Sequence, residues 1–227
     1  MKLCVALDHK DREKNLELCK ELKDFDIWLK VGFRSFIRDG RDFLKEIKDI
    51  NPNFKIFLDL KLYDIPNTMA DAAEEIAKME ADMFNVHASA GEKAMRAVME
   101  RLRSFENPPI VLAVTALTSF DNESFKKIYG EDIDKKAIEF AKSAYESGLS
   151  GVVCSVFESL KIKENTSYDF LTLTPGIRPF GEDSADQKRV GDLKSAKREK
   201  SDFIVVGRPI YKAKDPKEVV WRILQEI

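Results

Sequence analysis

The amino-acid sequence predicts a (β/α)8 barrel of the TIM type that forms a single domain over residues 1–227. Eight short runs rich in apolar and β-branched residues alternate with longer segments of helical period, and no linker or block of like charge interrupts the series. Such barrels commonly occupy about 200 to 250 residues. A doubly wound sheet is the alternative, but no GxGxxG motif follows the first apolar run, where a dinucleotide-binding fold would place it.

The apolar runs define the expected strands and the segments between them define the expected helices. The strands are expected over residues 3–8, 26–32, 54–61, 82–88, 110–117, 151–156, 170–176 and 203–209. Residues 67–81 show the helical pattern well, because apolar side chains from Met69 to Ile76 recur on one face. Asn67 or Thr68 is expected to cap that helix.

Composition excludes several classes of protein. Apolar residues make up 44% of the chain and charged residues 34%, as in a folded soluble enzyme, and the net charge of −2 offers no footprint for nucleic acid. Lys2 and Asp8 interrupt the first apolar run, which predicts a cytoplasmic protein without a leader or membrane span. Cys4, Cys19 and Cys154 are far apart and form no CxxC pair, so we expect buried thiols rather than disulfides or a zinc site.

The third apolar run carries the strongest signal for a functional site. It reads FLDLKLYDIPNT over residues 57–68, with charges inside an otherwise apolar strand. Alternation along the strand places Asp59 and Lys61 on one face with Phe57, and the leucines on the other. The leucine face suits the helix layer, which leaves two charges pointing into the barrel. Buried charges there must be paired or functional, and a purely structural ion pair is the plain alternative.

Charged residues also end two other predicted strands. Asp8 closes the first run and Lys30 lies near the end of the second, on the same face as Trp28. Active sites of these barrels lie at the carboxyl ends of the strands, so both residues are candidates. Each also has a simpler reading, since Asp8 could cap a helix and Lys30 could extend its charge to the surface. His87 ends the fourth run, and a packed histidine is the expectation there.

At this point the sequence resembles the orotidine 5'-monophosphate decarboxylase family, whose hallmark is DxKxxD followed by IPNT. The resemblance extends over nearly the whole chain in one order. It covers ALD, LKVG, the DxKxxD residues Asp59, Lys61 and Asp64, then VTALTS, TPGIRP and VVGRPI. Several elements in one order are more specific than any single motif.

The resemblance implies decarboxylation of orotidine 5'-monophosphate to UMP, the last step of de novo pyrimidine nucleotide synthesis, with no metal and no cofactor. It implies that Lys61 stabilises the carbanion at C6 and then protonates it. Asp59 would lie near the departing carboxylate and position Lys61. Asp8 and Lys30 would contact the ribose, and Thr118 the pyrimidine.

Phosphate recognition is expected in the loops after the seventh and eighth strands, where TIM barrels often hold phosphate. Gly207 would let the backbone approach the phosphate, and Arg208 could hold it in a bidentate fork, although Arg208 could also be a surface residue. Residues 177–187 resemble the lid of the family. By that resemblance Arg178 belongs to the substrate site, and Gln187 bridges the phosphate and the base.

The position of Asp64 suggests a site shared between two subunits. It lies three residues after Lys61, so in a continuing strand it would face away from the barrel interior. Pro66 cannot donate to a strand ladder, which indicates that the chain leaves the strand here. The resemblance implies a homodimer in which Asp64, Ile65 and Thr68 reach the partner's site. A tight turn that returns Asp64 to its own site remains open.

Three other functions stay open at this stage. The DxKxxD motif is shared with metal-dependent 3-keto-L-gulonate 6-phosphate decarboxylases and hexulose phosphate synthases, but these carry a metal-binding Glu where this chain has Lys30. An ammonium there would repel a divalent cation. The second alternative is a nucleotide-binding protein without catalysis, which would have no need of a proton donor at Lys61. The third is a phosphate-binding barrel with different chemistry.

Overall fold

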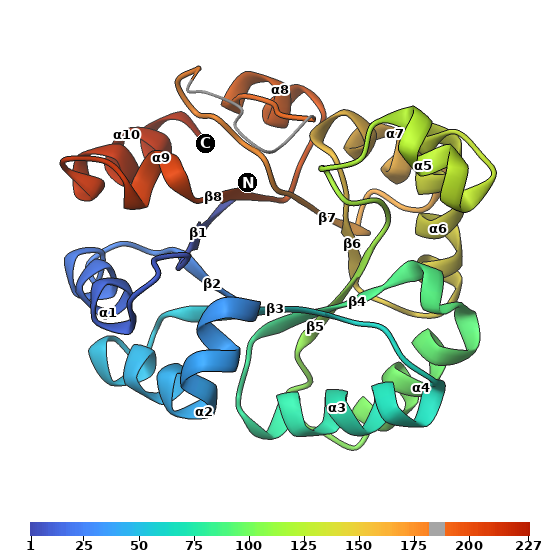
Figure 1. The fold of residues 1–227 in the computed structure, drawn as a ribbon, viewed down its shortest axis with the longest axis horizontal. Helices are drawn as coiled ribbons and strands as arrows, with labels where there is room; N and C mark the ends of the chain where they lie inside the picture. The colour runs from blue at the N-terminus through green and yellow to red at the C-terminus, as the bar shows by residue number, and fades with distance from the viewer. Residues whose placement is uncertain (182–188) are drawn as a thin grey trace.

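The computed structural model describes residues 1–181 and 189–227, and within them eight parallel strands close into a barrel in chain order (Figure 1). The strands are β1 (Lys2–Ala6), β2 (Trp28–Gly32), β3 (Lys55–Leu62), β4 (Met83–His87), β5 (Ile110–Val114), β6 (Gly151–Val153), β7 (Leu171–Thr174) and β8 (Phe203–Val206). Pairing of β1 with β8 closes the ring. The predicted fold class is confirmed.

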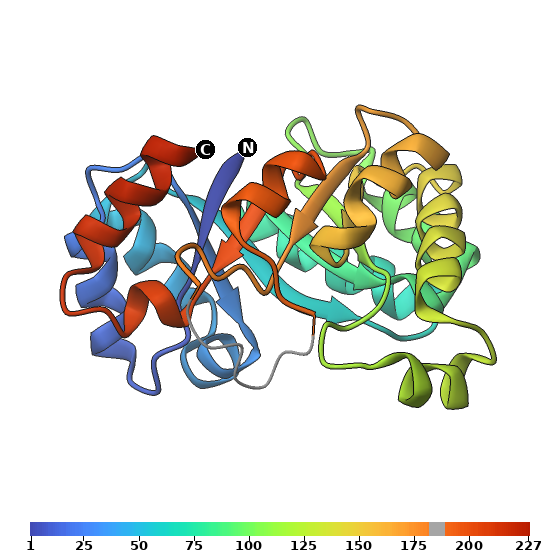
Figure 2. The same ribbon diagram turned by 90° about the horizontal axis from the view of Figure 1, so that it is seen from above.

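Helices surround the barrel as an outer layer (Figure 1). They are α1 (Arg12–Glu21), α2 (Phe33–Ile50), α3 (Pro66–Lys78), α4 (Glu92–Leu102), α5 (Asn122–Tyr129), α6 (Ile133–Glu146), α7 (Ser159–Asn165), α8 (Leu193–Arg198), α9 (Arg208–Tyr211) and α10 (Pro216–Glu226), with short 3-10 turns η1 (Ala88–Ala90) and η2 (Val156–Glu158). Both chain termini lie at one end of the barrel and α5 lies at the other (Figure 2). None of the helices in the described part of the chain is long and apolar enough to cross a membrane.

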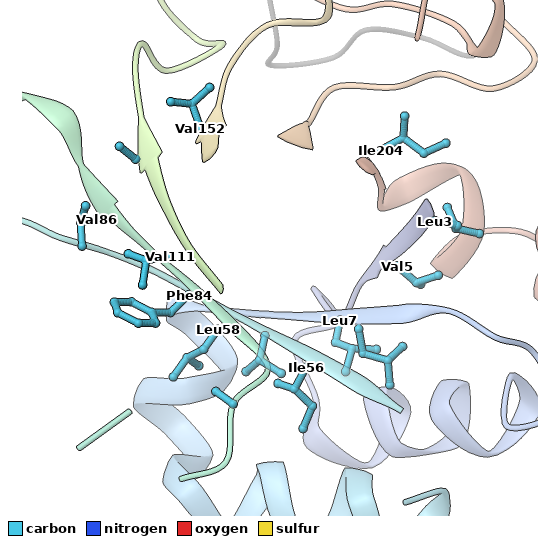
Figure 3. Packing of buried hydrophobic residues seen from close by; sticks show 14 of the residues in the cluster. Leu3, Val5, Leu7, Ile56, Leu58, Phe84, Val86, Val111, Val152 and Ile204 are labelled. Carbon is cyan, nitrogen blue, oxygen red and sulfur yellow. The ribbon is translucent and has the colours of Figure 1, made fainter. Parts of the chain in front are cut away.

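Strand alternation divides the apolar residues into two layers. Outward-facing side chains pack against the helices, and Figure 3 shows several of them, among them Val5 of β1, Leu58 of β3 and Phe84 of β4. Inward-facing side chains form a second cluster inside the barrel. This inner cluster contains Cys4, Ala6, Trp28, Phe57, Met83, Leu112, Val114, Val153, Leu173, Phe203 and Val205. The interior is therefore a packed core that supports the carboxyl ends of the strands.

The apolar runs of the sequence located every strand, but several runs extend beyond the strand end. The run over residues 110–117 contains β5, which stops at Val114, and the run over 151–156 contains β6, which stops at Val153. Most residues past these strand ends are buried in the loops above the barrel, Ala116 and Cys154 among them. Burial of these loops explains why they carry an apolar pattern without continuing the ladder.

The predicted cap of α3 is wrong. The helix begins at Pro66, and Ile65, whose side chain has no hydrogen-bonding group, occupies the N-cap position. Proline is favoured in the first helical turn because its fixed φ suits the helix and its missing N–H would have no partner there. Asn67 and Thr68 consequently lie inside the first turn and cap nothing.

Strand β3 departs from regular pairing near its end. Leu58 pairs with Phe84 and Leu62 pairs with Val86, so three residues of β3 lie opposite one residue of β4. Within this bulge Lys61 has a φ of 47°, a left-handed conformation that is uncommon for a residue other than glycine. The leucine face is nevertheless kept, since Leu58 is fully buried and both Leu60 and Leu62 pack against the outer core.

The three cysteines are free and buried, as the sequence predicted. Cys4 faces the barrel interior, Cys19 lies on α1 and Cys154 follows β6. Burial raises the pKa of Cys19 to about 12, and it raises the pKa of Cys154 well above the ordinary thiol value.

A stability prediction follows from the close approach of β6 and β7. A Cβ atom at Gly151 would lie 2.2 Å from the carbonyl oxygen of Leu171, which is backbone and cannot move aside cheaply. Gly151→Ala should lower the free energy of unfolding by about 3 kcal/mol, as overpacking does. Gly130→Ala is the control, because its Cβ meets no atom within 4 Å and it carries only the cost of a left-handed φ, about 1 kcal/mol. Chemical denaturation measures both; equal losses would contradict the steric account.

Candidate active site

A cavity of about 280 Å³ opens at the carboxyl ends of the barrel strands. Eight of the residues that the sequence singled out line it, and they come from β2 and β3 and from the segments that follow β1, β5, β7 and β8. They are Asp8, Lys30, Asp59, Lys61, Thr118, Arg178, Gly207 and Arg208. Residues from distant parts of the sequence thus converge where active sites of this fold lie.

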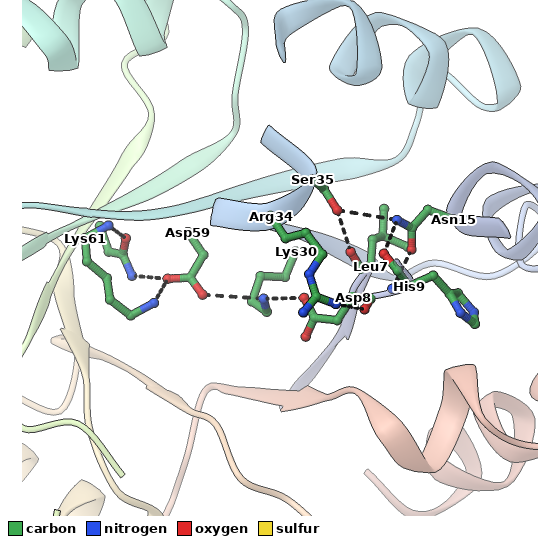
Figure 4. Close-up of polar contacts among 10 residues, drawn as sticks. Leu7, Asp8, His9, Asn15, Lys30, Arg34, Ser35, Asp59 and Lys61 are labelled. Carbon is green, nitrogen blue, oxygen red and sulfur yellow. Dashed lines mark hydrogen bonds and ion pairs between the residues drawn. The ribbon is translucent and has the colours of Figure 1, made fainter. Parts of the chain in front are cut away.

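Four charges of alternating sign form a row along one wall of the cavity (Figure 4). Lys30 Nζ lies 3.3 Å from Asp8 Oδ1 and 3.5 Å from Asp59 Oδ2. Lys61 Nζ lies 2.6 Å from Asp59 Oδ1. Each interior charge of the row therefore has an opposite charge on both sides, which is the arrangement that makes buried ions tolerable.

Lys30 is held between two carboxylates rather than extended to the surface. Its side chain is only 12% exposed. Burial opposes the charge of Lys30, but the neighbouring Asp59 and Asp8 carboxylates prevail and raise its pKa above the ordinary value. A Cβ atom at Gly32 would come within 3.1 Å of the ammonium, so this glycine leaves the space that Lys30 occupies. Asp8 is not a helix cap either, since α1 has Asp11 at its N-cap.

Asp59 stays ionised in spite of its burial. Burial alone would raise the pKa of this carboxyl. The ammonium groups of Lys30 and Lys61 and a hydrogen bond from Asn85 have the larger, opposite effect, so the pKa of Asp59 lies below its ordinary value. Asn85 Nδ2 donates to Asp59 Oδ1 over 2.8 Å. Sequence reasoning missed Asn85, although an amide at an inward position of the fourth apolar run was a usable signal.

The loops after β7 and β8 bring the arginines Arg178 and Arg208 to the cavity wall. Arg178 is buried, its main-chain N–H donates to the Gly191 carbonyl over 2.8 Å, and its Nη1 donates to the Ile177 carbonyl over 3.2 Å. Gly207 has a φ of −114° and a ψ of −96°, and a Cβ atom there would lie 3.4 Å from Ala6 Cβ. Its proposed role in approach to a phosphate stays a prediction, and Gln187 lies outside the described residues.

Arg189 forms a further link that sequence reasoning missed. Its guanidinium donates to the buried Glu158 carboxylate and, over 3.3 Å each, to the carbonyls of Ala116 and Leu117. Glu158 also accepts the N–H of Ser155 at the start of η2. The loop that carries Thr118 is thereby fastened to the start of the segment that leads to α8. No local pattern marks this pair, because its members are distant in sequence.

Asp64, Ile65 and Thr68 are not among the described residues that line the cavity. Asp64 is exposed, and its Oδ1 accepts the N–H of Ile65 over 2.6 Å. Ile65 and Tyr63 are apolar residues with 66% and 64% of their surface exposed. Within one chain, Asp64 thus lies on an exposed segment beyond the end of β3 and outside the cavity wall.

His87 is packed, as expected. Its Nδ1 lies 2.6 Å from Ser89 Oγ, and its ring stacks on Tyr63 with a centroid distance of 5.5 Å. Burial, together with the charge of Lys61, lowers the pKa of His87. His87 is not among the described residues of the cavity wall, so we assign it no chemical role.

The donor set at the cavity does not suit a metal ion. In residues 1–181 and 189–227, no group of three or more His, Cys, Asp and Glu side chains converges in a way that could hold one. The two carboxylates of the charge row, Asp8 and Asp59, have the Lys30 ammonium between them. A divalent cation would have to displace that ammonium or accept its repulsion.

Residues 1–223 match the sequence family described as the orotidine 5'-phosphate decarboxylase / HUMPS family. The chain belongs to this family. The membership of this family that the DxKxxD and IPNT residues indicated is thereby confirmed.

Relatives named orotidine 5'-phosphate decarboxylase match the whole chain. One from Sulfurimonas denitrificans is 68% identical over 227 residues, with 100% of both chains covered. One from Nitratiruptor sp. is 66% identical over 227 residues, again with 100% of both chains covered.

Solved structures of the family have the same fold. A structure titled as orotidine 5'-phosphate decarboxylase from Lactobacillus acidophilus superposes with a TM-score of 0.86 at 35% identity, and covers 99% of this chain and 98% of that one. The structure of orotidine 5'-phosphate decarboxylase from Pyrococcus horikoshii gives a TM-score of 0.79 at 26% identity over the same shares.

The electrostatics of the charge row can be measured directly. Lys30→Met removes one of the two ammonium groups that oppose burial of Asp59, so the pKa of Asp59 should rise from its lowered value. Carboxyl ¹³C NMR across a pH titration reports this shift. Lys14→Met is the control, because Lys14 pairs only at the surface, 3.8 Å from Asp11. An unchanged titration of Asp59 in Lys30→Met would show that Lys30 does not set its charge state.

Proposed function

We propose that this chain decarboxylates orotidine 5'-monophosphate to UMP, the last step of de novo pyrimidine nucleotide synthesis. The row Asp8–Lys30–Asp59–Lys61 on the cavity wall carries the proposal. Full-length relatives that bear the name of this enzyme at 60% to 68% identity support it. The cytoplasmic location and the absence of a nucleic-acid partner stay predictions from the sequence.

The reaction needs electrostatic stabilisation. When the bond between C6 and the carboxylate breaks, CO2 leaves and the electron pair stays on C6 in the plane of the ring, where the π system cannot delocalise it. A fixed cation beside C6 stabilises that pair more than it stabilises the substrate. The lysines of the row are held by their carboxylates before any substrate arrives, so little reorganisation is required during the reaction.

We assign the proton transfer to Lys61. Its ammonium stabilises the developing carbanion, then donates one proton to C6 to give UMP, and the neutral amine regains a proton from water. Asp59 positions this ammonium through the 2.6 Å contact and lies near the departing carboxylate. Asp8 and Lys30 contact the ribose.

The remaining cavity residues bind the parts of the substrate that do not react. Thr118 contacts the pyrimidine, whereas Arg178, Gly207 and Arg208 hold the phosphate side, with Gln187 between phosphate and base. All but Gln187 line the described cavity. Binding energy from the distant phosphate then serves to orient the reacting carbon.

The metal-dependent sugar-phosphate reactions of the family are not favoured. Those enzymes need a carboxylate on the second strand where this chain has Lys30, and Lys30 already pairs with both Asp8 and Asp59. A silent nucleotide-binding role is also disfavoured, because such a protein has no use for the ammonium of Lys61 beside the reacting carbon.

We further propose that the active unit is a homodimer, with Asp64, Ile65 and Thr68 at the partner's cavity. Asp64 stands outside the cavity of its own chain, on a rim with exposed apolar side chains. Among these, Tyr63, Ile65 and Phe33 expose half or more of their surface. Contiguous exposed apolar residues are typical of interaction surfaces.

The primary test is a spectrophotometric assay that follows the loss of orotidine 5'-monophosphate absorbance. The purified protein should turn the substrate over, and exhaustive treatment with EDTA should leave the rate unchanged. Activity that disappears with EDTA and returns with a divalent metal would support the sugar-phosphate reactions instead.

In the same assay, Lys61→Ala should abolish turnover, since it removes the proton donor. It should leave a folded protein that still binds UMP, because the leucine face of β3 is untouched. Calorimetric titration with UMP checks the binding. Lys55→Ala is the control, as Lys55 lies at the other end of the same strand and pairs with Asp82. Substantial residual decarboxylation by Lys61→Ala would refute its assignment.

The shared site can be tested by mixing two inactive variants, Lys61→Ala and Asp64→Asn, under conditions that allow subunits to exchange. In a mixed dimer one site collects both substitutions and the other is wild type, so activity should return to about half of the normal value per heterodimer. Lys61→Ala mixed with the double variant is the control, since no wild-type site can form. If exchange is verified and activity does not return, Asp64 serves its own chain.

A further inference from the structure

Asn85 occupies the single β4 position that faces the bulge of β3. Leu58 pairs with Phe84 and Leu62 pairs with Val86, so Asn85 alone lies opposite the three residues from Asp59 to Lys61. Its side chain points into the barrel, because both strand neighbours belong to the outer core. It is 1% exposed, in a layer otherwise filled by apolar residues such as Met83 below it.

Both ends of the Asn85 amide are used, and both bonds go to the bulge. Asn85 Oδ1 accepts the main-chain N–H of Lys61 over 2.7 Å. Asn85 Nδ2 donates to Asp59 Oδ1 over 2.8 Å, the same oxygen that Lys61 Nζ contacts. One neutral side chain therefore ties the backbone of Lys61 to the carboxylate that holds its ammonium.

The backbone of Lys61 needs such a tie. Its φ of 47° lies in the left-handed region, which residues other than glycine adopt only when their surroundings impose it. The N–H of Lys61 is satisfied at this irregular position by the Asn85 side chain, and a main-chain N–H at a buried position needs such an acceptor. An apolar residue of similar size would fill the space but would supply neither bond.

We propose that Asn85 is a positioning residue for the decarboxylation, which holds Lys61 in its left-handed conformation and fixes its ammonium against Asp59. This inference rests on the proposed function. It assigns Asn85 no contact with the substrate. The amide sets where the proton donor stands, and binding of the ribose and phosphate does not depend on it.

Asn85→Ala should lower kcat by about 100-fold, the loss that a misplacement of about 1 Å causes, while KM changes little. Thr172→Val is the matched control. Thr172 is a buried polar residue of β7, bonded to Asp202 and Ser159, and it is not part of the cavity wall. Both variants lose buried hydrogen bonds, so both should lower the melting temperature, but Thr172→Val should keep the wild-type kcat.

Asn85→Asp provides a readout that a purely structural role would not produce. A protonated Asp at this position offers one O–H donor and one carbonyl acceptor, the same pair as the amide. The ionised form keeps the acceptor, loses the donor and repels Asp59. The ratio of the variant's kcat to the wild-type kcat should therefore rise as the pH falls, whereas the ratio for Asn85→Ala should stay flat.

The groups around position 85 favour protonation of an Asp placed there, at pH values within the range of the assay. Asp59 and Lys61 face it from β3, Lys30 lies beyond Asp59 on β2, and His87 follows on β4. The opposite residue on β5 is the apolar Leu112. A buried carboxyl beside the ionised Asp59 has a raised pKa, and Asp59 keeps its charge because the two lysines stabilise it.

The outcomes separate this inference from the proposed function. If the wild-type protein does not act on orotidine 5'-monophosphate, the proposed function is wrong. If the wild type is active and Asn85→Ala keeps its kcat, or if the ratio for Asn85→Asp does not rise toward low pH, the inference is wrong. Should Asn85→Ala fail to fold, the ratio for Asn85→Asp decides alone, since it compares one folded protein at two pH values.

Discussion

The site depends on one buried carboxylate. Asp59 contacts Lys61 through one oxygen and Lys30 through the other, and Asn85 donates to it as well. Removal of this carboxylate would leave two ammonium groups together in a poorly solvated cavity, which is costly. The adjacency of β2, β3 and β4 is thus an electrostatic requirement of the site as well as a property of the barrel.

Apolar side chains of the inner core also line the cavity, and they strengthen the charge row. On the side of β5 to β8, the inward residues near the mouth are apolar, Val114, Val153, Leu173 and Val205 among them. Apolar walls keep the local dielectric low, and charges act on one another more strongly there than in water. The inner core thereby supports the strands and also amplifies the field of four side chains.

Much of the fold and site could be predicted from the sequence because it follows from local periodicity. Alternation along the third run placed Asp59 inward, and Pro66 indicated that the chain leaves the strand near Asp64. The left-handed φ of Lys61 and its bond to Asn85 could not be predicted, since they arise from pairing between strands. The same holds for the contact of Arg189 with Glu158. The cap of α3 was misjudged because Pro66 outweighed the polar residues that follow it.

The burial of the cysteines has a consequence for following the protein in solution. A thiol reacts with alkylating reagents as the thiolate and only where reagent can reach it, so these thiols react only when their surroundings open. Cys4 lies in the barrel interior, Cys19 on α1 and Cys154 in the loop above β6. Their labelling rates would therefore compare the local opening of the inner core, the helical shell and the mouth of the cavity within one unmodified chain.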